Sequence, residues 1–256
     1  MMKAIMLAAG VGARLNAGPG HPPKVMLEFA GKSLLERHIE ILRYLGVGEI
    51  VMVTGYRNEA IHDGIAEAGA QDYVRTLYNP DFTAGSLVSL WAAREELTAG
   101  EDIIFMDADV LYDYRLMQRL LESGHANCLL LDRNVRPGED PVKICVRDGV
   151  IIDFHKKIRT ACDYWGEWPG FLRVTPRLGR RVVEAMRAYV EAGRVNEMYE
   201  EAFRDTLLAE PAGAFRFEDI TGLPWAEIDF PEDLARAREE VLPQLKEIQP
   251  AEEGTG

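Results

Sequence analysis

The feature that most constrains this chain is its first predicted strand, residues 3–7, which runs directly into a loop containing Gly10 and Gly12. Arg14 follows in the same loop, and Lys24 comes soon after in a Pro-Lys pair. Small residues let a backbone approach a ligand closely, and loop N–H groups can bind phosphate oxygens. The start of the chain therefore predicts a polyphosphate site at the end of a strand, with Arg14 and Lys24 supplying positive charge.

Two better-known phosphate motifs are excluded by particular residues. The Gly-Lys-Ser run at 31–33 resembles the end of a Walker A loop, but Met26 stands where that motif needs glycine, and no strand precedes it. The Gly-x-Gly at 10–12 resembles the dinucleotide fingerprint, but its closing position is Leu15, where that fold needs Gly or Ala. We therefore expect neither a P-loop nor a Rossmann dehydrogenase.

The first 135 residues alternate apolar strands with amphipathic helices, which predicts an α/β fold with a mostly parallel sheet. Ligands bind such sheets at the carboxyl ends of the strands. The second half begins with a hairpin through Asp148-Gly149, and we expect it to form a smaller subregion over that edge. The predicted strands are 3–7, 49–54, 72–78, 102–106, 127–132, the hairpin 142–156, and 168–174. The predicted helices are 33–45, 58–68, 86–97, 112–122, 176–191 and 197–209.

Three carboxylates suggest a metal site. Asp107 and Asp109 stand two apart at a strand end, where alternation would point both side chains the same way. Asp229 precedes a helix that opens at Pro231. Carboxylate oxygens suit Mg²⁺. The alternative is structural: aspartates commonly cap helices, form turns and favour the positive end of a helix.

These motifs resemble, in type and order, the sugar-phosphate and small-alcohol nucleotidyltransferases with a GT-A-like fold. The similarity covers residues 3–240 and is nearest to the cytidylyltransferases that act on phosphocholine, 2-aminoethylphosphonate or inositol-1-phosphate. It implies a single Rossmann-like domain at 1–244, with a mostly parallel central sheet and a small β-hairpin and helical subregion. Residues 1–135 would be the nucleotide-binding half and 136–244 the acceptor-binding half with its closing helix. The tail 245–256 is polar and is expected to be flexible.

The resemblance also implies roles for individual residues. Lys24, Arg14 and Asp109 would be catalytic, while Asp109 and Asp229 would hold Mg²⁺ with Glu227 in support. The chain departs from its relatives at 85–86, where they tend to have two asparagines, so this segment leaves base selectivity open. The expected nucleotide-binding residues are Leu7, Ala8, Ala9, Gly10, Gly12, Asn79, Gly85, Ser86 and Asp107.

An acceptor pocket is expected from the second half of the chain. Lys156 matches a lysine at the family's acceptor site, with a solvated lysine as the alternative. Tyr164, Trp165 and Trp168 crowd one segment, where aromatic faces could hold an ammonium group or simply form a hydrophobic cluster. Trp225 is expected in the core. The expected acceptor-binding residues are Lys143, Lys156, Trp165, Glu167, Trp168 and Gly170.

The expected reaction is attack of an acceptor phosphate or phosphonate oxygen on the α-phosphorus of CTP, with release of pyrophosphate. That oxygen is already ionised at neutral pH, so no general base is needed. Three alternatives remain: a UTP- or dTTP-dependent sugar-1-phosphate nucleotidyltransferase, a GT-A glycosyltransferase and a non-catalytic nucleotide sensor. A glycosyltransferase would need no triphosphate lysine after the glycine loop.

Composition narrows the partners. The 256 residues, 47% of them apolar, can bury one large core, and a net charge of −13 argues against nucleic-acid binding. No apolar run approaches the ~18 residues of a membrane span, and no signal peptide precedes the first strand, so a cytoplasmic protein with small-molecule substrates is expected. A homodimer is compatible with the sequence, which leaves the oligomeric state open. Cys128, Cys145 and Cys162 are odd in number and lack zinc-site spacing, which predicts free thiols.

Overall fold

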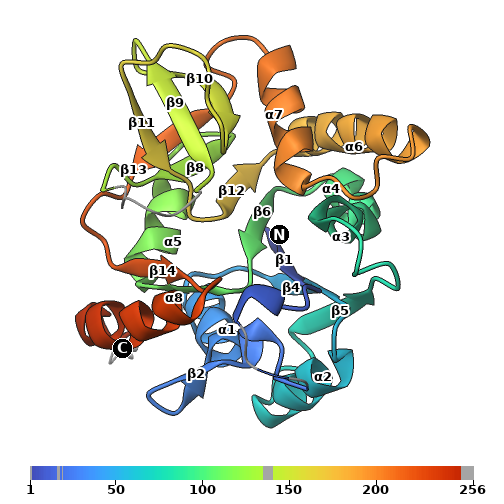
Figure 1. Ribbon diagram of the computed structural model, residues 1–256, viewed down its shortest axis with the longest axis vertical. Coiled ribbons are helices and arrows are strands. Elements are labelled where there is room, and N and C mark those ends of the chain that lie inside the picture. The colour runs from blue at the N-terminus through green and yellow to red at the C-terminus, as the bar shows by residue number, and fades with distance from the viewer. Residues whose placement is uncertain (1, 16–17, 19, 135–140, 249–256) are drawn as a thin grey trace, which may run out of the picture.

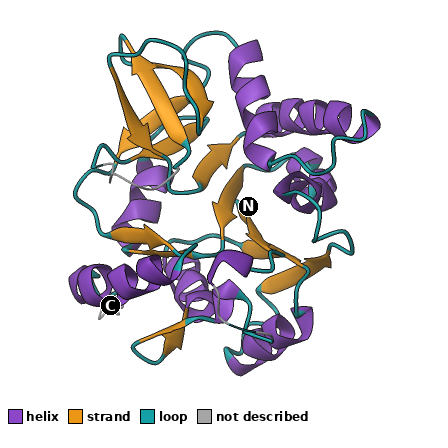
Figure 2. Ribbon diagram, in the orientation of Figure 1, coloured by secondary structure: helices purple, strands orange, loops and turns teal. Residues whose placement is uncertain are grey.

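The computed structural model describes residues 2–15, 18, 20–134 and 141–248, and all statements below concern these residues. A seven-stranded sheet passes through the middle of the molecule, with helices packed against it (Figures 1 and 2). A smaller three-stranded sheet lies beside the helix α7 (Figure 1) and contacts the central sheet near β8 and β13. The α/β fold with a mostly parallel central sheet is therefore confirmed.

The central sheet has the strand order β13-β8-β12-β6-β1-β4-β5, and β12 is the member that runs antiparallel to both of its neighbours. The small sheet has the order β10-β9-β11, and the remaining strands form two short pairs. The strands are β1 Lys3–Ala8, β2 Glu28–Phe29, β3 Lys32–Ser33, β4 Glu49–Thr54, β5 Val74–Tyr78, β6 Ile103–Asp107, β7 Val110–Tyr112, β8 Cys128–Leu131, β9 Lys143–Arg147, β10 Val150–His155, β11 Tyr164–Glu167, β12 Phe171–Val174, β13 Arg216–Asp219 and β14 Trp225–Glu227.

Most helices lie where the apolar periodicity predicts them. The segment predicted as one helix at 86–97 is two helices that meet at Ala93, and the helix predicted to begin at 112 begins at Tyr114, because Asp113 caps it. The helices are α1 Leu34–Tyr44, α2 Asn58–Glu67, α3 Ser86–Ala92, α4 Arg94–Thr98, α5 Tyr114–Glu122, α6 Pro176–Glu191, α7 Tyr199–Ala209 and α8 Pro231–Arg236, which continues as a π-helical turn Ala237–Val241.

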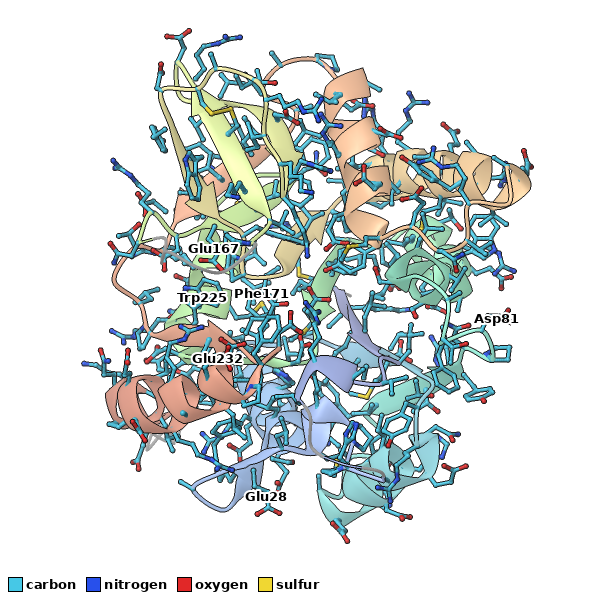
Figure 3. All side chains as sticks on the ribbon, viewed as in Figure 1. Glu28, Asp81, Glu167, Phe171, Trp225 and Glu232 are labelled. Atoms are coloured by element: carbon cyan, nitrogen blue, oxygen red, sulfur yellow. A yellow bond between two sulfur atoms is a disulfide. The ribbon has the colours of Figure 1, made fainter. Side chains whose placement is uncertain are left out.

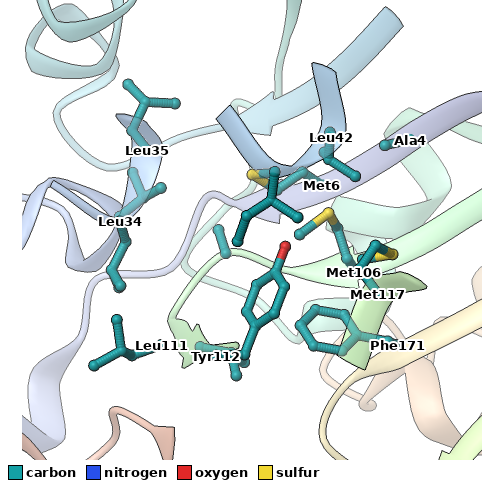
Figure 4. Packing of buried hydrophobic residues seen from close by; sticks show 14 of the residues in the cluster. Ala4, Met6, Leu34, Leu35, Leu42, Met106, Leu111, Tyr112, Met117 and Phe171 are labelled. Carbon is teal, nitrogen blue, oxygen red and sulfur yellow. The ribbon is translucent and has the colours of Figure 1, made fainter. Parts of the chain in front are cut away.

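The central sheet is covered on both faces, and alternation along β1 shows why. Ala4 and Met6 belong to a core with α1 and α5, whereas Ile5 belongs to a second core with α3, α6 and α7. In the first core Tyr112 packs against Phe171, with a distance of 4.8 Å between ring centroids (Figure 4). Strands buried on both faces need continuous apolar runs, which is how this sequence reads.

Parallel pairing positions the site. β1 lies between β4 and β6 in register, so Leu7 pairs with Asp107 and Ala8 with Thr54. The carboxyl ends of these three strands therefore reach the same edge of the sheet, and the glycine loop and Asp109 emerge there together. The predicted convergence of segments ~100 residues apart in sequence is observed.

The Gly-Lys-Ser run at 31–33 starts the helix α1, in agreement with the prediction that it is not part of a P-loop. The Ser33 hydroxyl caps α1 by accepting a hydrogen bond from the Glu36 backbone N–H, and the Glu36 carboxylate accepts from the Ser33 backbone in return. Lys32 pairs with Glu40 on the exposed face of the same helix. This reciprocal capping box fixes where α1 begins.

The prediction of three free thiols is wrong. Cys145 on β9 and Cys162, which precedes β11, form a disulfide across the small sheet, and their Cα atoms lie 5.7 Å apart (Figure 3). Antiparallel pairing of β9 with β11 brings the two residues together, whereas their spacing in sequence carries no such signal. Of the cysteines, Cys128 is free, and it is buried on β8.

The start of the predicted flexible tail is held against the domain. The Lys246 backbone N–H donates to Asp113, and Leu245 and Ile248 pack against the core that contains α1. The rest of the tail, 249–256, lies outside the described residues. Among the described helices, none combines the length and the apolar content needed to cross a membrane.

The buried His38 should make the fold sensitive to acid. Its Nε2–H donates to the Ala108 carbonyl at 3.0 Å, and burial lowers its pKa from 6.5 to about 4. Below about pH 6.5 the His38 imidazole is protonated in the unfolded chain but stays neutral in the folded protein. The free energy of unfolding should therefore decrease as the pH falls below about 6.5. The loss at pH 5 should be about 2 kcal/mol from this group.

Urea unfolding at pH 7 and pH 5 tests this expectation in the unaltered protein and in His38→Gln. The glutamine amide can still donate to Ala108 but does not titrate. The loss of unfolding free energy between the two pH values should therefore be smaller in the variant by about 2 kcal/mol. Equal pH dependence in the two proteins would contradict the expectation.

Candidate active site

A cavity of about 410 Å³ opens at the carboxyl edge of the central sheet. The glycine loop forms one wall, the ends of β6 and β14 form the floor, and the segments before α3 and α7 close it. Most of the expected nucleotide and metal residues line it. The expected residues in its lining are Leu7, Ala8, Ala9, Gly10, Gly12, Arg14, Lys24, Ser86, Asp107, Asp109, Glu227 and Asp229.

Lys24 connects two carboxylates that are far apart in sequence. Its Nζ lies 2.8 Å from the Asp109 Oδ2 atom and 2.5 Å from the Asp229 Oδ1 atom. Its side chain is 14% exposed. Burial by itself would lower the Lys24 pKa, but the two negative charges outweigh burial and raise it. The ammonium is therefore a permanent positive charge on the floor of the cavity.

Asp109, Glu227 and Asp229 form a carboxylate cluster, in which one oxygen of each lies within 4.8 Å of the others. Burial and then the charges of Asp109 and Asp229 raise the Glu227 pKa well above its ordinary value. Three oxygen donors so close together are a set that fits Mg²⁺. The Asp229 side chain contacts Lys24, whereas the N-terminus of α8 is capped by Asp233, which accepts from the Asp229 and Phe230 backbones.

Arg14 reaches the same cluster from the glycine loop. One guanidinium nitrogen lies 2.8 Å from the Asp229 Oδ2 atom, and the guanidinium carbon lies 5.3 Å from the centre of the Phe230 ring. Its side chain is 54% exposed, in contrast to the buried Lys24. Arg14 can therefore exchange its partner for a bound phosphate at low cost, since an exposed ion pair contributes little.

Asp107 is held differently from Asp109. Its Oδ2 atom accepts a hydrogen bond of 2.5 Å from the Tyr199 hydroxyl at the start of α7. Burial first, and the Asp109 charge second, raise the Asp107 pKa well above its ordinary value. Gly170 has a left-handed φ of +86°, and a Cβ there would lie 2.5 Å from the same oxygen. Asp107 thus joins the sheet edge to α7 rather than the carboxylate cluster.

Two expected nucleotide-binding residues do not reach the cavity. Asn79 is 3% exposed; its Nδ2 donates to the Ser89 hydroxyl, and its Oδ1 accepts from the Asp81 backbone. Gly85 is the N-cap of α3, and a Cβ there would lie 2.0 Å from the Glu197 carbonyl oxygen. Both residues shape the segment 79–86, whereas Ser86 itself lines the cavity and caps α7 through the Tyr199 N–H.

A second cavity of about 230 Å³ lies beside the first, towards the small sheet. Four of the expected acceptor-binding residues line it: Lys156, Glu167, Trp168 and Gly170. Glu167 is the last residue of β11, and on its other side it lines, with Trp225, a further cavity of about 170 Å³ (Figure 3). The residues common to both cavities are Arg14, Asp107, Met198, Tyr199, Glu200, Glu227 and Asp229.

The expected aromatic cluster does not converge on this cavity. Trp165 is 39% exposed and lies beneath the Lys143 ammonium, while Tyr164 stacks under Arg133. Lys143 itself donates to the Lys156 carbonyl oxygen at 2.8 Å, so neither Lys143 nor Trp165 lines the acceptor cavity. The strand β11 carries these side chains away from the cavity that Glu167 reaches at its end.

Trp168 and Trp225 are parts of the core. Trp168 is 4% exposed, packs 5.0 Å from the centre of the Phe154 ring, and donates its Nε1–H to the Phe171 carbonyl oxygen. Only part of Trp168 contributes to the cavity wall. Trp225 is 8% exposed and donates to Asp132, as its expected core position implies.

Sequence reasoning missed Met198, Tyr199, Glu200 and Phe230, which all line the second cavity. Glu200 is 9% exposed although it stands in the first turn of a helix, where acidic residues are usually solvated. Its pattern in sequence is that of an ordinary helix start, so no local signal identifies it. Glu200 is buried because α7 packs against α3 and β10.

Comparison with known proteins agrees with this geometry. Residues 4–202 match the model of the MobA-like NTP transferase domain, which is more than half of the chain. The chain belongs to this family. The expected resemblance to nucleotidyltransferases is therefore confirmed, and the glycine loop, Asp107, Asp109 and Lys24 all lie within the matched segment of this MobA-like domain.

Individual relatives point to cytidylyl transfer. The chain is 29% identical over 244 residues to CMP-5′-(3-aminopropyl)phosphonate synthase of Streptomyces rubellomurinus, covering 92% of this chain but 38% of that protein. It is 25% identical to CTP:phosphoglutamine cytidylyltransferase of Campylobacter jejuni, covering 91% and 98%. The structure of CTP:phosphocholine cytidylyltransferase from Streptococcus pneumoniae has the same fold, with a TM-score of 0.72, 21% identity and coverage of 93% and 98%.

Gly170→Ala should damage the site more than the fold. An alanine there would press on the Asp107 carboxylate, and a left-handed backbone costs a residue with Cβ about 1–2 kcal/mol. Gly222 has a similar φ of +90° with no atom within 4 Å of its Cβ position, so Gly222→Ala is a matched control. We expect similar losses of unfolding free energy, but a loss of pyrophosphate release of about tenfold or more only in Gly170→Ala. Equal activities of the two variants would show that Asp107 tolerates displacement.

Proposed function

We propose that this protein is a Mg²⁺-dependent cytidylyltransferase that joins CTP to a small phosphorylated alcohol or phosphonate. The triphosphate would lie against the glycine loop in the larger cavity, and the acceptor would lie in the smaller one. The names of its relatives support CTP and acceptors of the phosphonate or phosphate-ester class. Residues 1–244 would form the catalytic domain, with 1–135 mainly serving the nucleotide.

In the proposed reaction an anionic oxygen of the acceptor attacks the α-phosphorus of CTP. A new P–O bond forms to the acceptor, the bond between the α-phosphorus and the bridging oxygen to the β-phosphate breaks, and pyrophosphate leaves with that electron pair. Because the attacking oxygen is already ionised, no proton has to be removed first. The protein therefore contributes alignment and charge stabilisation, which suits a cavity whose described lining contains no histidine or cysteine.

The carboxylate cluster and two cations would divide this work. Mg²⁺, held by Asp109 and Asp229 with Glu227 in support, would neutralise the charge of the phosphates when bound. Lys24 would bind the α-phosphate as negative charge accumulates there, and Arg14 would hold the departing pyrophosphate. The two cavities share the wall that contains Asp229 and Arg14, so the acceptor and the triphosphate can meet over these groups.

The observation that carries the proposal is the position of the Lys24 ammonium between Asp109 and Asp229. A glycosyltransferase uses a nucleoside diphosphate sugar as its donor and needs no lysine after the glycine loop to bind a triphosphate. A nucleotide sensor needs no cluster of three carboxylates beside that lysine. Nucleotidyl transfer needs both, because the transition state gathers charge on the α-phosphate.

Lys24→Ala should lower kcat by about 100-fold to 1000-fold, the usual effect of losing one transition-state contact. The control is Lys32→Ala, which removes the same charge from an exposed lysine that pairs with Glu40. Pyrophosphate release and thermal unfolding would be measured for both variants. Near-normal turnover by a folded Lys24→Ala protein would remove Lys24 from the mechanism.

The donor should be CTP. Pyrophosphate release would be measured for CTP, UTP, GTP and ATP, each with 2-aminoethylphosphonate, phosphocholine, inositol-1-phosphate and glucose-1-phosphate. We expect CTP with one of the first three acceptors to be the best pair, by about tenfold or more in kcat/KM. A preference for UTP with glucose-1-phosphate would replace this proposal with sugar-nucleotide synthesis, and release without an acceptor would contradict transfer altogether.

A further inference from the structure

Glu200 is the buried carboxylate of the site that is not explained by metal binding or by packing. It is 9% exposed and lines both cavities. Its Oε2 atom is buried and has no hydrogen-bond partner among the described residues. Leaving a buried carboxylate oxygen without a donor is costly, so such an atom in a cavity wall indicates a ligand that donates to it.

Asp107 and Asp229 also line both cavities, and both have partners: Asp107 accepts from the Tyr199 hydroxyl, and Asp229 contacts Lys24 and Arg14. Glu227 belongs to the carboxylate cluster proposed to hold Mg²⁺, and Asp233 of the smaller cavity accepts two backbone N–H groups. Glu200 differs from them in its open oxygen. A donor bound there would complete the hydrogen bonding of this wall.

The charge distribution near Glu200 suits a ligand with both signs of charge. Lys156 lines the same cavity, and its positive charge acts on Glu200, although burial dominates and raises the Glu200 pKa to about 7. A ligand anion can therefore lie near Lys156 while a donor group lies near the Glu200 Oε2 atom.

The aromatic residues that line this cavity offer little free ring surface. The Trp168 and Tyr199 rings pack against the Phe105 ring and are 4% and 5% exposed. The Phe230 ring is already covered by the Arg14 guanidinium. A trimethylammonium group carries no N–H donor and is recognised through several aromatic faces. A primary ammonium carries three donors and suits a buried carboxylate.

We infer that the acceptor carries a primary ammonium group, which Glu200 binds through its Oε2 atom while Lys156 binds the acceptor's phosphonate or phosphate. This inference rests on the proposed transfer to a small phosphorylated acceptor. It narrows the acceptor class to aminoalkyl phosphonates and aminoalkyl phosphates, and it excludes polyol phosphates and quaternary amines as preferred acceptors. Glu200 is thus a specificity-determining residue, separate from the groups that act on the triphosphate.

The first test compares 2-aminoethylphosphonate with n-propylphosphonate, in which a methyl group replaces the ammonium, and with phosphocholine. Pyrophosphate release from CTP would be followed at pH 8, where Glu200 is ionised. We expect kcat/KM of the unaltered protein for 2-aminoethylphosphonate to exceed that for either other acceptor by about 100-fold, mainly through KM. A ratio near one, or a preference for phosphocholine, would overturn the inference whatever any variant does.

The second test changes Glu200 to Gln, which keeps the shape and removes the charge. The 100-fold preference for 2-aminoethylphosphonate over n-propylphosphonate should fall below about tenfold. Glu201→Gln is the matched control, because Glu201 is the next residue on α7 and pairs with His155 instead. An unchanged preference in Glu200→Gln, or an equal decrease in Glu201→Gln, would contradict the assignment.

A binding measurement separates this inference from the proposed function. Absence of turnover with CTP and every acceptor would overturn the cytidylyltransferase proposal, but titration calorimetry of the unaltered protein with 2-aminoethylphosphonate and n-propylphosphonate would still test the ammonium site. We expect about 100-fold tighter binding of the amine, reduced below about tenfold in Glu200→Gln. Equal binding of the two phosphonates would overturn the ammonium site.

Discussion

The buried ion pairs of Lys24 with Asp109 and Asp229 are the constraint on which the site depends. The two aspartates are 85 and 205 residues from the lysine in sequence, and one ammonium group holds both. Removing the lysine would leave a cluster of three carboxylates without its nearest positive charge, and a broken buried pair costs far more than an exposed one. The same arrangement therefore joins the segments after β6 and β14 to Lys24 and leaves a cation in the wall of the larger cavity.

The second organising element is the start of α7, whose residues Met198, Tyr199 and Glu200 line both cavities. Tyr199 bonds Asp107, and the Glu200 Oε2 atom has no hydrogen-bond partner among the described residues; all three side chains line both cavities. The backbone of Glu197 packs directly on Gly85, which leaves no room for a Cβ there. The two cavities therefore share one short segment, so changes at the start of α7 should alter both of them.

The lining of the larger cavity was largely predictable from the sequence, because several of its groups stand at strand ends. The glycine loop follows β1, Asp107 ends β6 and Asp109 comes just after it, so parallel pairing alone brings them together. The acceptor side was predicted less well, since its residues come from a helix start, a small sheet and the turn before α8. Lys156 and Glu167 were found, but Trp165 and Lys143 point elsewhere and Glu200 was missed.

The sequence by itself determined the α/β fold, the glycine loop after the first strand and the carboxylates at strand ends, because apolar periodicity and residue type act locally and parallel strands align their ends. Only the tertiary structure decided which side chains of the second half face a cavity. The pairing of β9 with β11 joined Cys145 to Cys162, and the packing of α7 buried Glu200. These outcomes depend on register and on contacts between distant segments, which no local pattern specifies.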